Sequence, residues 1–139
     1  MKKALLMLAL LASGCVQFPP NPADIEAKKF QAVADKSIIY VVRPPVDSDH
    51  PGVVTIDGTL QIPTFQGTYN RVELAPGNHL IEGVIPPSLR LTINTQPGQI
   101  YFLRLSVRGT SRSGPTTASL ETVSPEYGRT LVAQATMYP

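Results

Sequence analysis

The residues with chemically active side chains are few and scattered along the chain. Histidine occurs twice and cysteine once among 139 residues, whereas a metal site needs several such ligands close together. Asp47 and Asp49, in the segment Asp47-Ser48-Asp49-His50, could bind a hard cation. The segment lacks the glycine and the distal glutamate of a calcium loop. We therefore expect a solvated polar turn there, and no metal or cofactor.

Groupings that could support catalysis are equally weak. The serines between Gly109 and Gly114 lack the Gly-x-Ser-x-Gly spacing of a nucleophile elbow, so we expect a loop. Glu73 and Glu82 fall on strands that we expect to be neighbours, where two carboxylates could act on a glycosidic bond. The better explanation is that both carboxylates are solvated side chains on the exposed face of a sheet. His79 follows a Pro-Gly turn, and we expect its ring to pack beside a tyrosine or to bond a backbone carbonyl. The sequence thus predicts a protein that is not an enzyme.

Three arginines near the end of the chain form the strongest candidate contact surface. Arg104 and Arg108 point to the same side of an alternating strand, about 13 Å apart along it, and Arg112 follows in the next loop. Guanidinium groups pair with phosphates and carboxylates in a bidentate manner. The row could therefore meet lipid phosphates or acidic groups of cell-wall peptides. Alternatively, it is a solvated face whose charge Glu121 or Glu126 balances.

The first fifteen residues form a distinct segment. Met1-Lys2-Lys3 is positively charged, residues 4–12 are an unbroken apolar run, and Ser13-Gly14-Cys15 closes it. This order is typical of a secretory signal. The run of about nine apolar residues is much shorter than the ~20 that a membrane-spanning helix needs.

Residues 11–15, Leu-Ala-Ser-Gly-Cys, resemble the lipobox of bacterial lipoproteins, with Ala12 where leucine is commonest. The resemblance implies that residues 1–14 are the signal peptide and that cleavage follows Gly14. It also implies that Cys15 is lipidated and that palmitate is among its acyl chains. As the only cysteine, Cys15 has no disulfide partner within the chain, and acylation accounts for its isolation. Val16 stands where lipoproteins retained in the inner membrane carry Asp. We therefore expect an anchor in the outer membrane, facing the periplasm, with membrane lipid as the first partner.

Composition limits the other partners. Without the signal, the chain contains ten basic and ten acidic residues, so the mature chain is neutral. We therefore expect no binding of nucleic acid. The 14 prolines and the low share of charged residues, 16%, disfavour long helices. Another envelope protein or a cell-wall component is the expected further partner.

The body of the chain alternates short apolar strands with turns. We expect a proline-rich tether with a helix over residues 23–34 within residues 15–36, and then a β domain over residues 37–139. Asp57-Gly58 predicts a hairpin, Pro76-Gly77 a second tight reversal, and Ser124-Pro125 the start of a closing helix. Such spacing is typical of a small antiparallel β-sandwich or open barrel. We expect about seven strands, with a short N-terminal helix and a C-terminal helix.

The middle of the chain also resembles a known family. The strand and turn segments at residues 39–43, 54–58, 67–69, 74–79 and 97–104 are similar, in order and spacing, to the domain-of-unknown-function 2846 family of bacterial envelope lipoproteins. Residues 54–58 and 74–79 also resemble PEGA-type β-sandwich modules. The resemblance implies a lipid-anchored β domain with no assigned activity. We expect an interaction or structural module of the envelope. The alternative is a lipoprotein that binds a glycan or small molecule in a pocket near Tyr40 and Tyr69.

Overall fold

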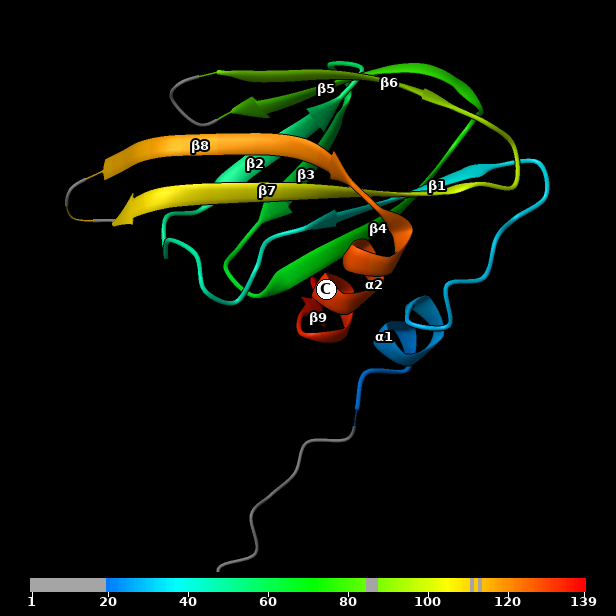
Figure 1. The fold of residues 1–139 in the computed structure, drawn as a ribbon, viewed down its shortest axis with the longest axis horizontal. Helices are drawn as coiled ribbons and strands as arrows, with labels where there is room; N and C mark the ends of the chain where they lie inside the picture. The colour runs from blue at the N-terminus through cyan, green and yellow to red at the C-terminus, as the bar shows by residue number, and fades with distance from the viewer. Residues whose placement is uncertain (1–19, 85–87, 111, 113) are drawn as a thin grey trace, which may run out of the picture.

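The computed structural model describes residues 20–84, 88–110, 112 and 114–139, which form nine strands and two helices (Figure 1). In chain order these are α1 (Pro22–Ala27), β1 (Ser37–Val42), β2 (Gly52–Ile56), β3 (Leu60–Thr64), β4 (Thr68–Leu74), β5 (Gly77–Val84), β6 (Leu89–Thr95), β7 (Ile100–Thr110), β8 (Gly114–Val123), α2 (Pro125–Ala133) and β9 (Thr136–Met137). The expected β-sandwich with a helix near each end is confirmed.

The strands form two sheets. One has five strands in the order β8-β7-β1-β4-β9, and the other has four in the order β3-β2-β5-β6. Most neighbours are antiparallel, as expected, but β1 pairs with β7 and β4 pairs with β9 in parallel. Both parallel pairs join segments that are far apart in the sequence. A pattern of turns between successive strands contains no signal for such pairs.

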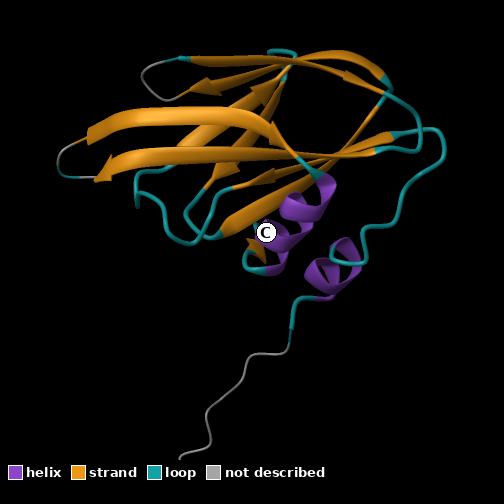
Figure 2. Cartoon of the chain, in the orientation of Figure 1, coloured by secondary structure: helices purple, strands orange, loops and turns teal. Residues whose placement is uncertain are grey.

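The molecule has three layers and two apolar cores, because the five-stranded sheet lies between the four-stranded sheet and the helices (Figure 2). Strand β1 is buried along its whole length, as its run of β-branched residues predicts. Its side chains alternate between the cores. Ile39 and Val41 face the other sheet, whereas Ile38, Tyr40 and Val42 face the helices. We call the side toward the helices the outer face of the five-stranded sheet.

The turn residues act as expected at one position and differently at another. Asp57 and Gly58 both have positive φ, 53° and 67°, and close the β2–β3 hairpin. Gly77 also has positive φ, but β4 and β5 belong to different sheets. The expected second tight reversal is therefore wrong: this turn carries the chain from one sheet to the other. Glu73 and Glu82 are consequently not on neighbouring strands.

The two helices differ in how well their limits follow the sequence. Helix α2 begins as predicted, with the Ser124 side chain accepting from the backbone N–H of Tyr127. Helix α1 ends at Ala27, well before the expected residue 34, and Phe30 adopts a positive φ of 51°. The chain turns here because Phe30 packs against Tyr40 and Phe102 in the outer core. Residues 22–33 thus contact the domain rather than standing away from it. The helices in the part of the chain that the structure describes are too short to span a bilayer.

Candidate binding groove on the five-stranded sheet

The helices cover only part of the outer face, and the side chains of β7 change character where the cover ends. Phe102, at 2% exposure, lies beneath α2 in the outer core. Arg104, Ser106 and Arg108 follow on the same side at alternate positions, beyond the helix. One strand face is therefore apolar at Phe102, beneath the helix layer, and polar from Arg104 onward.

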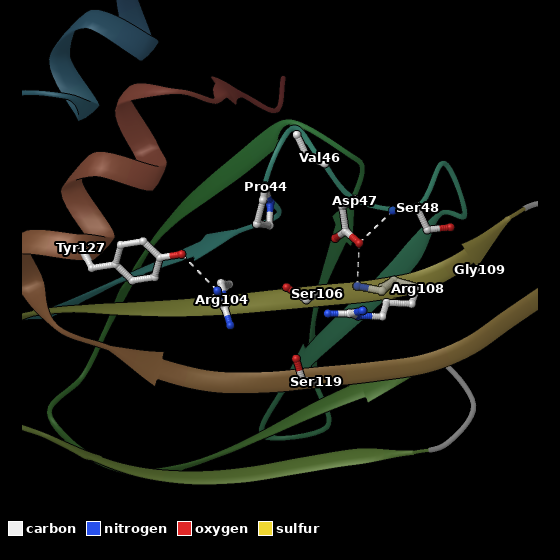
Figure 3. A pocket seen from close by; sticks show the side chains of 11 residues that line it. Pro44, Val46, Asp47, Ser48, Arg104, Ser106, Arg108, Gly109, Ser119 and Tyr127 are labelled. Carbon is white, nitrogen blue, oxygen red and sulfur yellow. Dashed lines mark hydrogen bonds between the residues drawn. The ribbon is translucent and has the colours of Figure 1, made fainter.

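The uncovered part of the face forms an open groove with a cavity volume of about 620 Å³ (Figure 3). Its floor is β7 with Ser119 of β8, one end is Tyr127 of α2, and one wall is the loop between β1 and β2. The described residues that line it are Pro44, Val46, Asp47, Ser48, Arg104, Ser106, Val107, Arg108, Gly109, Ser119 and Tyr127.

Arg104 is held in place at the end of the groove. Its Nη1 donates to the Tyr127 hydroxyl at 3.0 Å, and its Nη2 donates to the Glu121 carboxylate on β8. Burial opposes the charged form of Arg104, but the hydrogen bonds to Tyr127 and Glu121 outweigh it and raise the pKa of the guanidinium. Its Nε is the one buried side-chain nitrogen or oxygen among the described residues that lacks a hydrogen-bond partner. Glu121 thus balances this arginine, as the alternative interpretation expected.

Arg108 carries an uncompensated charge. It is exposed, its side chain lies along β7 (Figure 3), and no carboxylate of the described chain forms an ion pair with it. Arg112 is exposed in the connection to β8 and is not among the described residues that line the groove. The structure therefore brings two of the three predicted arginines into one groove.

The loop wall is built around Arg43, whose side chain is fully buried. Its Nη1 donates to the carbonyl of His50 at 2.7 Å, and its Nη2 donates to that of Ser48 at 2.7 Å. Its Nε pairs with Asp47 at 3.3 Å. A buried guanidinium must have such partners to offset its desolvation. Arg43 thus fixes the shape of the loop from below.

Asp47 joins this wall to the floor of the groove. One carboxylate oxygen meets Arg43, and the other accepts from the backbone N–H of Ser48 and of Val107 on β7, both at 2.8 Å. The expectation of a solvated polar turn is therefore wrong for Asp47, whose side chain is 4% exposed. The described residues contain no cluster of three or more His, Cys, Asp or Glu side chains that could hold a metal ion.

The remaining candidates lie elsewhere. Glu73 pairs with Arg71, and Glu82 with Arg90. His79 bonds the carbonyl of Ala75, one of its two expected environments, and also bonds Asp57. Cys15 and the serines at 111 and 113 lie outside the described residues.

Tyr40 and Tyr69, near which a ligand pocket was expected, are themselves buried, and the cavity of about 320 Å³ beside them is lined by Ala23, Glu26, Ala27, Gln31, Arg71 and Met137. Both rings have 0% exposure and belong to the outer core. Tyr40 stacks on Phe102 with ring centroids 5.2 Å apart, and its hydroxyl donates to the carbonyl of Ala27 at 2.6 Å. Phe30 and the backbone of α1 therefore cover the Tyr40 ring, and neither tyrosine is open to a ligand.

Sequence reasoning missed Arg43 and Tyr127 as parts of this site. Arg43 follows the β-branched and aromatic run at residues 38–42, and an arginine at that position is usually the solvated end of a strand. Tyr127 follows a recognisable helix start. Its place in the first turn of α2 could have suggested a side chain near the end of β8.

The lining of the groove supplies hydrogen-bond donors and positive charge rather than a catalytic pair. Two guanidinium groups and the hydroxyl-bearing Ser106, Ser119 and Tyr127 surround it, and its described carboxylate, Asp47, is already bonded. Guanidinium and hydroxyl groups of this kind donate hydrogen bonds to anionic groups such as phosphates and carboxylates. No protein-family model and no curated protein matches this chain. The resemblance to the domain-of-unknown-function 2846 family stays a prediction.

Proposed function

We propose that this chain is a non-enzymatic lipoprotein of the bacterial cell envelope, anchored through Cys15 in the outer membrane and facing the periplasm. The observation that carries the proposal is the N-terminal segment itself. A short positive start, an unbroken apolar run and Ser13-Gly14 lead directly to the one cysteine of the chain. A secreted protein that needed no anchor would have no use for this unpaired thiol.

The arrangement of the folded part is compatible with such an anchor. Helix α1 begins at Pro22, seven residue steps after Cys15, and its contacts with the outer core attach the N-terminal end firmly to the domain. Acyl chains contribute about 0.8 kcal/mol per buried CH2, and more than one chain is needed for stable attachment. Three chains on Cys15 would hold the protein at the membrane permanently.

A binding role fits the groove better than catalysis. Its described lining offers cations and hydroxyls but lacks a nucleophile hydrogen-bonded to a base, which group transfer would need. The competing role, capture of a glycan or small molecule, was expected near Tyr40 and Tyr69, whose rings are fully buried and so are not open to a ligand. We therefore assign contact with other envelope components to the domain, through the groove.

Radiolabelled palmitate tests the anchor in cells that express the full chain. We expect incorporation into the wild type and into Ser13→Ala, which keeps a small residue before the cysteine, and no incorporation into Cys15→Ser. Mass spectrometry of the purified wild type should show an acylated N-terminus at Cys15. Labelling of Cys15→Ser at the wild-type level, or an unmodified cysteine in the mature protein, would overturn the proposal.

A further inference from the structure

The groove opens on the side of the molecule from which the anchoring segment departs. Helix α1 packs on the outer face of the five-stranded sheet, through Ala27 and the Tyr40 side chain beneath it. Arg104 and Arg108 stand on this same outer face, in line with Phe102 on β7. Figure 3 shows Tyr127 of α2 next to Arg104 at one end of the groove. A membrane surface next to the N-terminal end of α1 therefore also faces the groove.

The anchoring segment is short compared with the domain. Seven residue steps from Cys15 to Pro22 reach at most about 25 Å when fully extended. Strand β7, with 11 residues, is about 36 Å long. A tether shorter than the domain keeps its point of attachment next to the bilayer surface. In the lipidated protein, α1 and the outer face on which it packs consequently stay within reach of the headgroups.

The charge of this face matches a negative surface. In and under the groove, Asp47 balances the charge of Arg43, and Glu121 balances that of Arg104. The third guanidinium leaves one net positive charge. That charge is the exposed Arg108.

The rim of the groove carries an apolar side chain that the fold leaves uncovered. Val46, at the tip of the loop wall, is 94% exposed and follows Pro44 and Pro45. Arg43 and Asp47 hold this loop rigidly, so its exposure is built into the structure. A small apolar tip beside a cation suits the boundary between headgroups and acyl chains.

From these observations we propose that the groove and the Val46 rim dock on the phosphate groups of anionic lipids in the membrane that holds the anchor, an inference that rests on the proposed function. The tether makes this contact intramolecular, so even a weak interaction is populated at the high effective concentration that a short linker provides. Docking then fixes the orientation of the domain, with the four-stranded sheet directed away from the membrane.

A fluorescent probe at the rim tests the docking on the lipidated full chain. Val46→Cys offers a single reactive thiol when Cys15 is acylated, so labelling at two sites would reveal failure of the anchor independently of docking. The protein is reconstituted into vesicles of phosphatidylcholine alone or of equal parts phosphatidylcholine and phosphatidylglycerol. We expect a headgroup-bound quencher to reach the probe in the anionic vesicles, and a probe on Thr92→Cys of the four-stranded sheet to stay unquenched in both.

Charge-matched variants identify the groove as the contact. Arg108→Gln should lower the ratio of docked to undocked protein about fivefold, the usual effect of one basic residue near an anionic surface. Arg90→Gln removes the same charge from the four-stranded sheet and should have no effect. High salt should abolish the quenching in the wild type, because the contact is exposed and electrostatic.

Three results would overturn the docking proposal. One is a rim probe that is not quenched in anionic vesicles by the acylated wild type. Another is an equal loss for Arg108→Gln and Arg90→Gln, which would mean non-specific attraction. The third is a probe that stays exposed on both kinds of vesicle but becomes protected when cell-wall peptides are added, because the groove would then bind the cell wall instead.

Discussion

The imidazole of His79 lies between two groups that can only accept hydrogen bonds. Its Nδ1 is 2.7 Å from a carboxylate oxygen of Asp57, and its Nε2 is 2.8 Å from the carbonyl oxygen of Ala75. Both ring nitrogens must donate to satisfy this geometry, which requires the imidazolium form. Burial alone would lower the pKa of His79, but the bonds to Asp57 and Ala75 outweigh it and raise the pKa above its usual value. The same contact lowers the pKa of Asp57.

This pair predicts that stability depends on pH within a defined range. Because the pKa of His79 is raised in the folded state, its contribution is complete below the unfolded pKa of about 6.5 and is lost as the pH rises through the folded pKa. For Asp57, whose pKa is lowered, the contribution is present above about pH 3.9 and is lost as the pH falls through the folded value. We expect the wild type to exceed His79→Asn in free energy of unfolding by about 1 kcal/mol near pH 5, with Asp57 partly screened by water.

Urea unfolding of both proteins across this pH range checks the expectation. The difference between them should shrink as the pH rises past the folded pKa of His79. His50→Asn serves as the control, because the ring of His50 bonds only the carbonyl of its own neighbour Pro51. A difference for His79→Asn that is constant from acid to alkaline pH would show that the ring acts through packing alone.

Single residues also show where sequence reasoning reaches its limit. Asp57-Gly58 was predictable because its positive φ angles are a local property of the two residues. The burial of Arg43 was not, since its partners are Asp47, Ser48 and His50, in a loop that folds back over it, and Thr64 at the end of β3. Whether an arginine after a strand is solvated or buried depends on that loop, and the pattern of the strand contains no information about it.

At the scale of elements, the contact of α2 with β7 depends on a glycine. A Cβ atom at Gly128 would lie 2.2 Å from Cγ of Phe102, so the helix approaches the sheet closely only because this position has no side chain. Helix propensity alone favours alanine over glycine by about 1 kcal/mol. We expect the opposite result here: Gly128→Ala should destabilise the protein by about 1–3 kcal/mol, the usual cost of overpacking.

Thermal or urea unfolding measures this effect against two reference variants. Thr130→Ala, at an exposed position of the same helix, should change stability by less than about 0.5 kcal/mol. Phe102→Leu should tolerate Gly128→Ala better than the wild type does, because the smaller side chain makes room for the methyl group. A stabilising Gly128→Ala in the wild type would contradict the close approach of α2 and β7.

Strands were more predictable than the layers that cover them. The alternation of Leu89, Leu91 and Ile93 with polar residues marked the inner face of β6, and the observed burial follows it. On β7 the inner residues Leu103, Leu105 and Val107 were equally clear. The outer face of β7 is apolar at Phe102 and polar from Arg104 onward, because helices cover only part of the sheet. Alternation within a strand cannot indicate where such a cover ends.

At the scale of the whole molecule, the two ends of the described chain meet. Asp24 on α1 accepts from the Tyr69 hydroxyl on β4 at 2.9 Å and from the backbone N–H of Met137 on β9 at 2.8 Å, and it pairs with Lys28 at 2.8 Å. Figure 1 shows the C-terminus close to α1. Burial would raise the pKa of Asp24, but its hydrogen bonds to Lys28, Met137 and Tyr69 outweigh this and lower it. No local pattern links residues 24 and 137, so this closure could not be predicted from the sequence.

Asp24→Asn should loosen both ends together. The loss of charge weakens three contacts at once, and we expect the free energy of unfolding to fall by about 2–3 kcal/mol. Hydrogen exchange at the Met137 amide should accelerate more than exchange in β1, because local opening of α1 and β9 would precede global unfolding.

Glu26→Gln on the same helix is the matched control, since Glu26 forms only an exposed pair with Lys29, worth less than about 1 kcal/mol. Equal exchange at Met137 in the two variants would show that Asp24 does not hold the ends. If it does, its loss also lengthens the free tether, and the rim of the groove should then spend less time at the membrane even though every groove residue is intact.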